Sequence, residues 1–183
     1  MKNIISISLA LLLAGILNAQ DLTYVKKKQL KANVSFLGLD INYENRITKH
    51  STINFEAGFN FGFSYSKSIF FGNNFSYIVS PTFSAEYRNY YNILKRIKNN
   101  KTTINNSGNF WSFTTGFKTR SIIAQNTYDS PVLYLVPAWG IQRSWGKHFN
   151  AEARFGVAIK YATVGANWSG SPNVRISIGY IIK

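Results

Sequence analysis

Most of this chain alternates apolar and polar residues with a period of two. The C-terminal stretch shows the alternation most clearly, because Val174 and Ile176 alternate with Arg175 and Ser177. Successive side chains of a strand point to opposite sides of a sheet, so this period predicts strands with one apolar and one polar face. The pattern therefore predicts an all-β fold, but it does not say which face meets water.

Seven stretches carry the alternation, and they cover residues 37–44, 53–64, 75–91, 110–120, 132–143, 149–161 and 174–182. Bacterial single-chain barrels have an even number of antiparallel strands, so we expect an eighth strand within 22–36. Polar connections are expected at 45–50, 66–74, 92–109, 121–131 and 164–173, with a tight turn at 144–147. Pro81 predicts a bulge, and Pro137 predicts a missing ladder bond. The predicted fold is a single antiparallel up-and-down transmembrane β-barrel with eight strands.

The N-terminus has the features of a secretory signal peptide. Lys2 precedes a short apolar stretch, Ile4–Leu17, and Ala19 provides a small residue at the expected cleavage site. This stretch is shorter than the roughly 20 residues that a transmembrane helix needs. We expect residues 1–19 to be removed and residues 20–183 to form one exported domain. Together with the strand pattern, this predicts a location in the cell outer membrane.

The charged residues indicate which face of the strands points inward. Both acids and bases fall on the polar face, in similar numbers, although the chain as a whole is strongly basic. A near balance is what a narrow closed interior requires, because an unpaired buried charge is costly. We therefore predict a packed lumen with a charge network formed by Asp40, Glu44, Glu56, Glu86, Arg88, Lys118, Arg120, Glu152, Arg154, Lys160 and Arg175. The alternative is a solvated polar face on a soluble barrel.

The net charge of +14 indicates which partners the chain attracts, and the absence of cysteine indicates how it is stabilised. A basic exported chain is attracted to anionic lipid head groups or lipopolysaccharide phosphates, and no nucleic-acid-binding motif accompanies the charge. Without disulfides, a closed strand ladder is one source of stability. The longest predicted connection contains a possible anion-binding segment, formed by Lys95, Arg96, Lys98 and Lys101. The alternative interpretation of this segment is a solvated loop.

Several segments give the chain a family resemblance, namely Glu86–Asn92, Lys95-Arg96, Asn106–Phe110, Trp139–Arg143 and Gly146–Asn150. With these segments the chain resembles the small outer-membrane β-barrels of Gram-negative bacteria, of the OmpA transmembrane-domain and OmpX type. It is similar, too, to the uncharacterised "outer membrane protein beta-barrel" proteins. The resemblance implies outer-membrane lipid, lipopolysaccharide and the barrel insertion machinery as partners, but no chemistry. One departure is the C-terminal residue, which is Lys183 and not an aromatic residue.

No residue pattern predicts catalysis, a cofactor or a metal site. The two histidines, His50 and His148, lie in short predicted turns, and their spacing fits no zinc-ligand pattern. Lipid A deacylases use a His-x-Ser arrangement, whereas Asn150 stands two residues after His148 in this chain. We expect a non-enzymatic outer-membrane protein with a structural, adhesive or envelope-stabilising role. Two alternatives stay open: a secreted or periplasmic lipocalin-like carrier of an apolar ligand, and a lipid A-modifying barrel enzyme.

Overall fold

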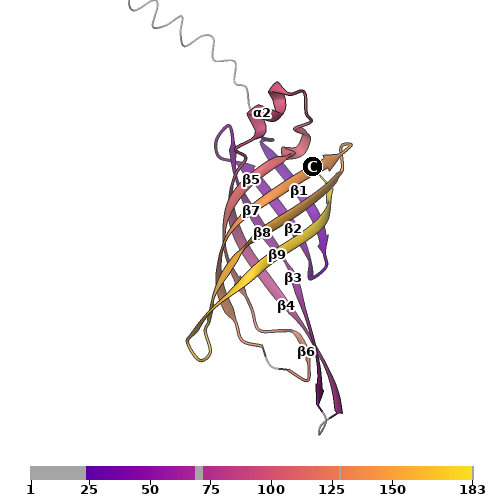
Figure 1. Ribbon diagram of the computed structural model, residues 1–183, viewed down its shortest axis with the longest axis vertical. Helices are drawn as coiled ribbons and strands as arrows, with labels where there is room; N and C mark the ends of the chain where they lie inside the picture. The colour runs from indigo at the N-terminus through magenta and orange to yellow at the C-terminus, as the bar shows by residue number, and fades with distance from the viewer. Residues whose placement is uncertain (1–23, 69–71, 128, 183) are drawn as a thin grey trace, which may run out of the picture.

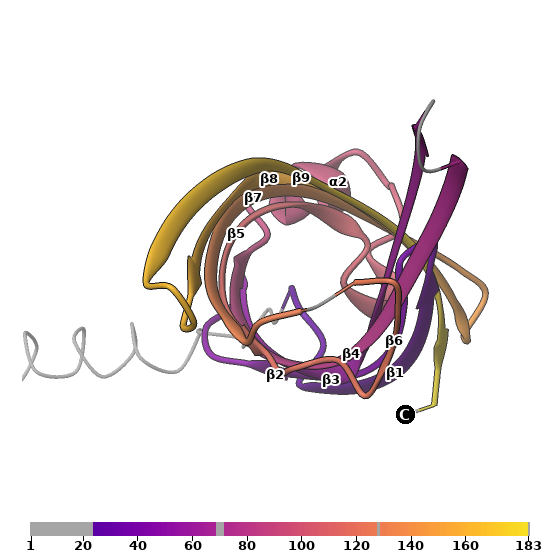
Figure 2. The same ribbon diagram turned by 90° about the horizontal axis from the view of Figure 1, so that it is seen from below.

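The chain folds into a β-barrel with a short helix at one end (Figure 1). The computed structural model describes residues 24–68, 72–127 and 129–182, so the predicted signal peptide at residues 1–19 lies outside the described part. Seen along the barrel, the strands form a ring (Figure 2). Among the described residues, no helix combines the length and the apolar character needed to cross a membrane.

The strands are β1 (Lys28–Ser35), β2 (Gly38–Arg46), β3 (Ser51–Ser68), β4 (Gly72–Asn89), β5 (Gly108–Lys118), β6 (Ile123–Gln125), β7 (Val132–Trp145), β8 (Phe149–Ala162) and β9 (Asn167–Ile181). Helix α2 (Ile93–Lys98) and the 3-10 turn η1 (Ile104–Asn106) lie between β4 and β5. Neighbouring strands pair antiparallel in the ring order β1, β2, β3, β4, β5, β7, β8 and β9. β9 then pairs with β1 and closes the ring, while β6 adds to β4. The predicted eight-stranded up-and-down barrel is confirmed, and β1 is the strand expected within 22–36.

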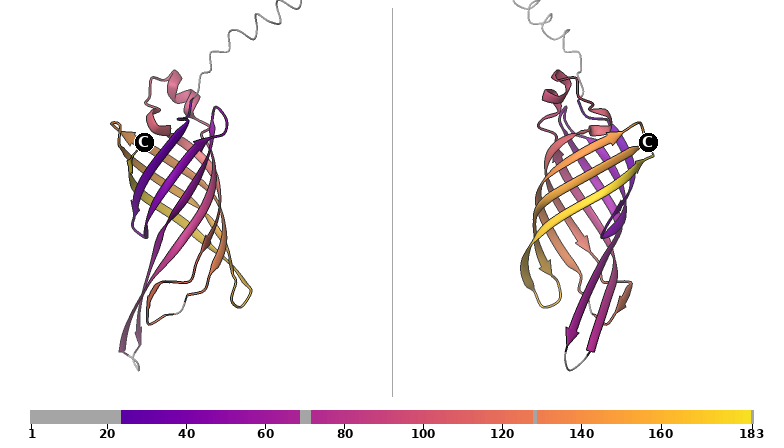
Figure 3. Two further views of the ribbon diagram at one scale, coloured as in Figure 1. Left: turned by 180° about the vertical axis from the view of Figure 1, so that it is seen from behind. Right: turned by 45° about the vertical axis from the view of Figure 1, so that its right-hand side comes forward.

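Two connections predicted from polar composition are wrong in extent. Residues 66–74 were expected to be a loop, but β3 and β4 pair without a break from Ser51↔Asn89 to Ser68↔Gly72. Residues 164–173 were expected to be a second loop, but β9 begins at Asn167 and pairs with β8 along its length. Polar residues are compatible with a strand wherever the partner strand satisfies the backbone groups. The β3–β4 hairpin therefore projects beyond the rest of the barrel (Figure 3).

The two prolines behave differently from one another. The predicted bulge at Pro81 is absent, because the register between β3 and β4 runs through this residue unchanged. Pro81 lies where β4 exchanges its partner β5 for β6, so its missing N–H falls in a gap of the ladder. The ladder between β7 and β8 has no pair at Pro137, as predicted from the missing donor.

The two ends of the barrel differ in what they carry. The start of β1, the end of β9, α2 and the turn at Gly146 lie at one end, which we call the terminus end (Figures 1 and 3). The β3–β4 hairpin and the turn at Gly165 lie at the other, which we call the hairpin end. The predicted connection 92–109 therefore lies on the same side as the turn between β7 and β8.

The outer face of the barrel is apolar and the inner face is polar. Phe55, Phe113 and Phe155 keep nearly half of their surface exposed, whereas Asn54 and Glu86, on the opposite face, are buried. Among the described side chains on the outer face of the ring strands, charge occurs only at Lys28 and Arg143, both near the terminus end. This distribution is the reverse of that in a water-soluble barrel.

Glycines on the inner face make room for aromatic rings. A Cβ on Gly140 would collide with the ring of Phe110, which is fully buried and packs at a tilt against Tyr90 with 5.3 Å between ring centroids. A Cβ on Gly116 would collide in the same way with the ring of Tyr134. These glycines on the inner face therefore leave the space that the rings of Phe110 and Tyr134 occupy.

The first prediction concerns this fit. Gly140→Ala is expected to lower the free energy of unfolding by about 1–3 kcal/mol, because the added methyl group displaces Phe110 from a closely packed position. Gly170→Ala is the matched control, since a Cβ on Gly170 meets nothing within 4 Å. Urea unfolding followed by tryptophan fluorescence measures both variants. Equal midpoints for the two variants would contradict the proposed packing of Phe110.

Candidate functional site

The interior of the barrel is organised around the guanidinium group of Arg88. Its Nη1 and Nη2 lie 2.7 and 3.1 Å from the two carboxylate oxygens of Glu152, which is a bidentate pairing. Nε and Nη2 also donate to Glu86 at 2.8 and 2.6 Å. The Phe110 ring covers the group, with 4.8 Å between Cζ and the ring centroid. Arg88 is 1% exposed, so these contacts replace water almost completely.

Arg154 extends the cluster to a second layer of carboxylates. Its nitrogens lie 2.9 Å from Glu86, 2.9 Å from Glu152 and 3.7 Å from Glu56. Arg88 and Arg154 therefore share two carboxylates that come from β4 and β8. Glu86 and Glu152 repel each other as like charges, and the two guanidinium groups that they share offset this repulsion.

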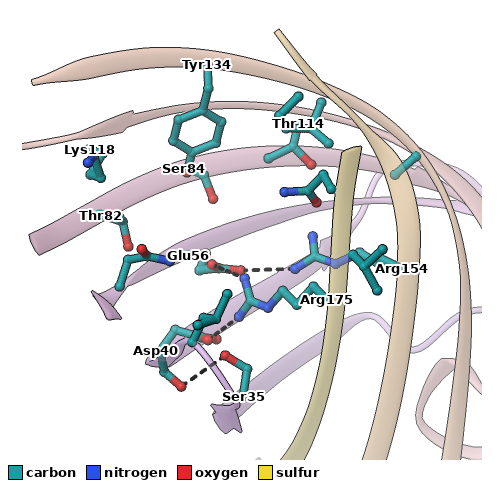
Figure 4. Close-up of a pocket in the computed structure, with 18 of the residues that line it drawn as sticks. Ser35, Asp40, Glu56, Thr82, Ser84, Thr114, Lys118, Tyr134, Arg154 and Arg175 are labelled. Atoms are coloured by element: carbon teal, nitrogen blue, oxygen red, sulfur yellow. Dashed lines mark hydrogen bonds and ion pairs between the residues drawn. The ribbon is translucent and has the colours of Figure 1, made fainter. Parts of the chain in front are cut away.

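Nearer the hairpin end, Arg175 of β9 joins two strands across the lumen. It donates to Glu56 on β3 and to Asp40 on β2. Asn33 and Asn42 also donate to Asp40, and through these contacts the carboxylate is tied to β1 as well as to its own strand. Figure 4 shows Asp40, Glu56, Arg154 and Arg175 converging on the lumen from four strands.

A third group of polar residues lies toward the terminus end. Lys31 Nζ lies 3.3 Å from Glu44, whose other oxygen accepts hydrogen bonds of 2.7 Å from Thr52 and Tyr90. Tyr90 follows the end of β4, and its burial, together with the adjacent Glu44 carboxylate, raises the pKa of the phenol well above its ordinary value. The phenol therefore keeps its proton and stays a donor. Gln142 connects this group to the central cluster by accepting a 3.1 Å hydrogen bond from Arg88.

The segment between β4 and β5 covers the terminus end of the lumen. Val25, Tyr90, Ile93 and Phe110 form a small buried apolar cluster there. Polar contacts fasten the same segment, since Gln142 donates to the carbonyl of Asn105 at 2.7 Å. Residues 90–107 therefore act as a cover over this end, which explains why so long a connection is present.

The other half of the lumen contains a cavity of about 300 Å³. Its polar lining includes Asp40, Glu56, Thr82, Ser84, Thr114, Lys118, Tyr134, Arg154, Lys160 and Arg175. Such a volume is at the lower end of the range for small-molecule sites. The central ion pairs and the cover lie between this cavity and the terminus end.

The structure brings together most of the residues predicted for the charge network. Asp40, Glu44, Glu56, Glu86, Arg88, Glu152, Arg154 and Arg175 form the connected groups described above. Lys118 lies apart from them and pairs with Asp129 at 2.6 Å. Lys160 lines the cavity but forms no ion pair with any carboxylate among the described residues. For Arg120 the prediction is wrong, because β5 ends at Lys118 and Arg120 is exposed in the following connection.

The predicted anion-binding segment lies on the cover at the terminus end. Lys95, Lys98 and Lys101 are exposed there. Arg96 differs, because its Nε and Nη2 donate to the carbonyl of Thr102 at 3.2 and 2.9 Å. Three of the four cations therefore face solvent, while the fourth stabilises the turn that follows α2.

Sequence reasoning missed several members of the interior. Lys31 and Gln142 are fully buried, and Tyr90 connects to both Glu44 and Gln142. Lys31 was missed because the alternation within 22–36 is weak, and Tyr90 because it follows the alternating part of β4. Neutral residues such as Gln142 carry no signal that separates a network member from an ordinary polar position.

Comparison of the chain with models of known protein families, with curated proteins and with solved structures finds no match. The likeness to the OmpA and OmpX type of barrel therefore stays a prediction. Function has to be argued from the geometry of the lumen and of the outer wall. Among the described residues, no three histidine or acidic side chains are grouped as a metal site would require.

The second prediction concerns the central cluster. Arg88→Ala is expected to cost about 3–5 kcal/mol of unfolding free energy, because it leaves Glu86 and Glu152 buried with half of their partners gone. Arg120→Ala is the matched control and should stay within about 0.5 kcal/mol of wild type, as surface substitutions do. Urea titration of each variant measures the difference. An Arg88 variant as stable as the control would show that the cluster does not stabilise the fold.

Proposed function

We propose that this protein is a non-enzymatic β-barrel of the bacterial outer membrane, with a lumen closed to free passage and a structural or adhesive role in the envelope. The observation that carries the proposal is the reversal of the two faces: large apolar side chains cover the outer wall, and paired charges fill the interior. A bilayer is the solvent in which such an arrangement is stable, because a closed strand ring leaves no unpaired backbone edge in lipid.

The carboxylates support this arrangement. Every Asp and Glu among the described residues takes part in an ion pair within the barrel or at its hairpin end. The phenylalanines of β3 point the other way, and Phe55, Phe59 and Phe63 are 49%, 45% and 58% exposed. The lipocalin-like alternative requires an apolar cavity inside the barrel, and the charged lining of this lumen argues against it.

Aromatic and basic residues at the terminus end support an interface with lipid head groups. The Trp139 indole donates to Tyr91 at 2.9 Å, and the Tyr87 and Trp111 rings lie 5.3 Å apart on the outer wall. Such girdles mark the boundary between hydrocarbon and head groups. Exposed lysines lie beyond this girdle, at positions 26, 27, 28, 95, 98, 101 and 147. Anionic outer-membrane lipid is therefore the proposed partner of this end.

The interior supports a role other than free conduction. The cover formed by residues 90–107 and the Arg88 cluster together occupy the terminus-side half of the lumen. Eight-stranded barrels have interiors of a width that side chains can fill. We expect the wild-type protein to show no steady open-channel current in planar bilayers, and a steady ohmic current would exclude a closed lumen.

The projecting hairpin supports an adhesive role in addition to a structural one. β3 and β4 extend past the other strands, and their aromatic residues Phe63, Tyr65 and Phe75 are more than half exposed. An exposed strand edge with apolar side chains can accept a strand from another chain. Loss of cell-surface binding after removal of the hairpin tip would support this role.

The third prediction tests the membrane assignment directly. Phe155→Arg is expected to cost about 2–4 kcal/mol, because its side chain would lie in hydrocarbon, whereas Tyr65→Arg on the projecting hairpin should cost about 0–1 kcal/mol. Unfolding in phosphatidylcholine vesicles measures both variants. A soluble barrel would tolerate both changes equally, since both side chains would meet water.

Fractionation provides the control for that experiment. The wild-type protein is expected in the detergent-soluble outer-membrane fraction, and its gel mobility should change on heating, as a folded barrel unfolds. Recovery from the soluble periplasm, with mobility unaffected by heat, would overturn the proposed location.

A further inference from the structure

The wall of the barrel has a notch toward the hairpin end. β1 and β2 are shorter than the other ring strands and are joined by a turn at Phe36 and Leu37 (Figure 3, left). On the side that faces β1, the first ladder partner of β9 is Ser177. On the side that faces β2, the last ladder partner of β3 is Asn60, followed by one hydrogen bond from Phe61 N to Leu37 O. We call the gap between these edges of β3 and β9, on the hairpin-end side of the β1–β2 turn, the notch.

The cavity in the lumen opens through this notch. Its lining includes Leu37 in the β1–β2 turn, Asn60, which is the last ladder partner of β3, and Val174, which precedes the first ladder partner of β9. The cavity therefore reaches the β1–β2 turn and both strand edges that border the gap in the wall. The unpaired edges of β3 and β9 provide that gap.

An apolar groove on the outer wall continues from the notch. It has a volume of about 570 Å³, and its outward-facing lining includes Val34, Leu39, Ile41, Phe59, Ile178 and Tyr180. Leu39, Asp40 and Phe59 line both the groove and the lumen cavity. The two spaces are therefore adjacent, with an apolar surface outside the wall and a polar one inside it.

The uncompensated charge in the cavity is positive. Asp40 and Glu56 are both occupied by Arg175, and Lys118 is paired with Asp129. Lys160 lines the cavity without an ion-pair partner among the carboxylates that the structure describes. A positive group without an ion-pair partner in a cavity favours an anionic ligand group.

We propose that the notch binds a single-chain amphiphile with an anionic head group, of the long-chain fatty acid class. The chain lies in the outer groove against Leu39, Phe59 and Ile178, and the head group enters the lumen cavity and pairs with Lys160. This inference rests on the proposed membrane location, because only there is the groove in contact with lipid chains.

The fourth prediction uses a palmitic acid that carries a diazirine near the end of its chain, together with the alcohol of the same length as a neutral probe. The full-length barrel is placed in phosphatidylcholine nanodiscs, illuminated with each probe and mapped by mass spectrometry. The acid is expected to label the groove residues about tenfold more than the alcohol does, since one charge-assisted contact separates them. Lys160→Gln should bring labelling by the acid down to that by the alcohol. Leu39→Trp should abolish groove labelling by both probes.

Two controls make the result decisive. Leu135→Trp adds the same ring to the outer wall away from the groove, and Arg120→Gln removes one exposed charge outside the cavity; neither should change the labelling. Even labelling around the wall, or equal labelling by acid and alcohol in wild type, would overturn the inference. If Leu39→Trp does not fold, as judged by heat-modifiable mobility, the labelling of Lys160→Gln by the acid still tests the inference. Failure of the wild-type chain to enter the nanodiscs would instead overturn the membrane location.

Discussion

The hydrogen-bonded ladder between β1 and β9 is the interaction on which the rest of this structure depends. It joins Lys31–Ser35 to Ser177–Ile181 and so closes the ring. Once the ring is closed, alternate side chains of every strand are enclosed and the others face outward. The enclosed set contains Glu44, Glu86 and Glu152, which are almost completely removed from solvent. Closure of the backbone therefore requires the ion pairs, and the ion pairs fix how the strands can be arranged.

Arginine is well suited to the central position of this interior. A planar guanidinium group donates in several directions at once, so Arg88 contacts carboxylates from two strands while its face packs on Phe110. Buried ion pairs add little net stability, because desolvation offsets most of the attraction. Their effect is to penalise any other arrangement, since a shifted register would leave a charge without its partner. We therefore expect the polar cluster to specify the register that the apolar outer wall leaves undetermined.

The two halves of the lumen differ: the terminus-side half is closed, and the other half contains the proposed binding site. At the terminus end, residues 90–107 and the Tyr90–Phe110 pair cover the interior, and the exposed lysines lie around them. Toward the hairpin end the wall is interrupted at the notch and the interior keeps a cavity. The proposed closed lumen and the proposed amphiphile site are compatible for this reason: the first depends on one half of the barrel and the second on the other.

The alternation in the sequence was sufficient to predict seven of the eight strands of the ring and the polarity of their faces, because both depend only on the period of two; the eighth strand was expected only from the even strand number of such barrels. It identified Glu86, Arg88, Glu152 and Arg154 as members of one inner face. It did not say that Arg88 would meet Glu152, 64 positions away, nor that Lys31 and Tyr90 would join them. It also placed Arg120 in the lumen, because periodicity alone does not show where a strand ends.

The lengths of the strands and the identity of their partners are determined by the tertiary structure. The sequence determined which side chains share one face of a strand, since the side to which a side chain points alternates along the strand. Only the closed barrel decided which charges meet, how far the β3–β4 hairpin extends and where the short β1–β2 hairpin leaves the wall open. These features depend on the register between strands that are distant in the sequence, and that register is set by the ladder and the packing of the whole ring.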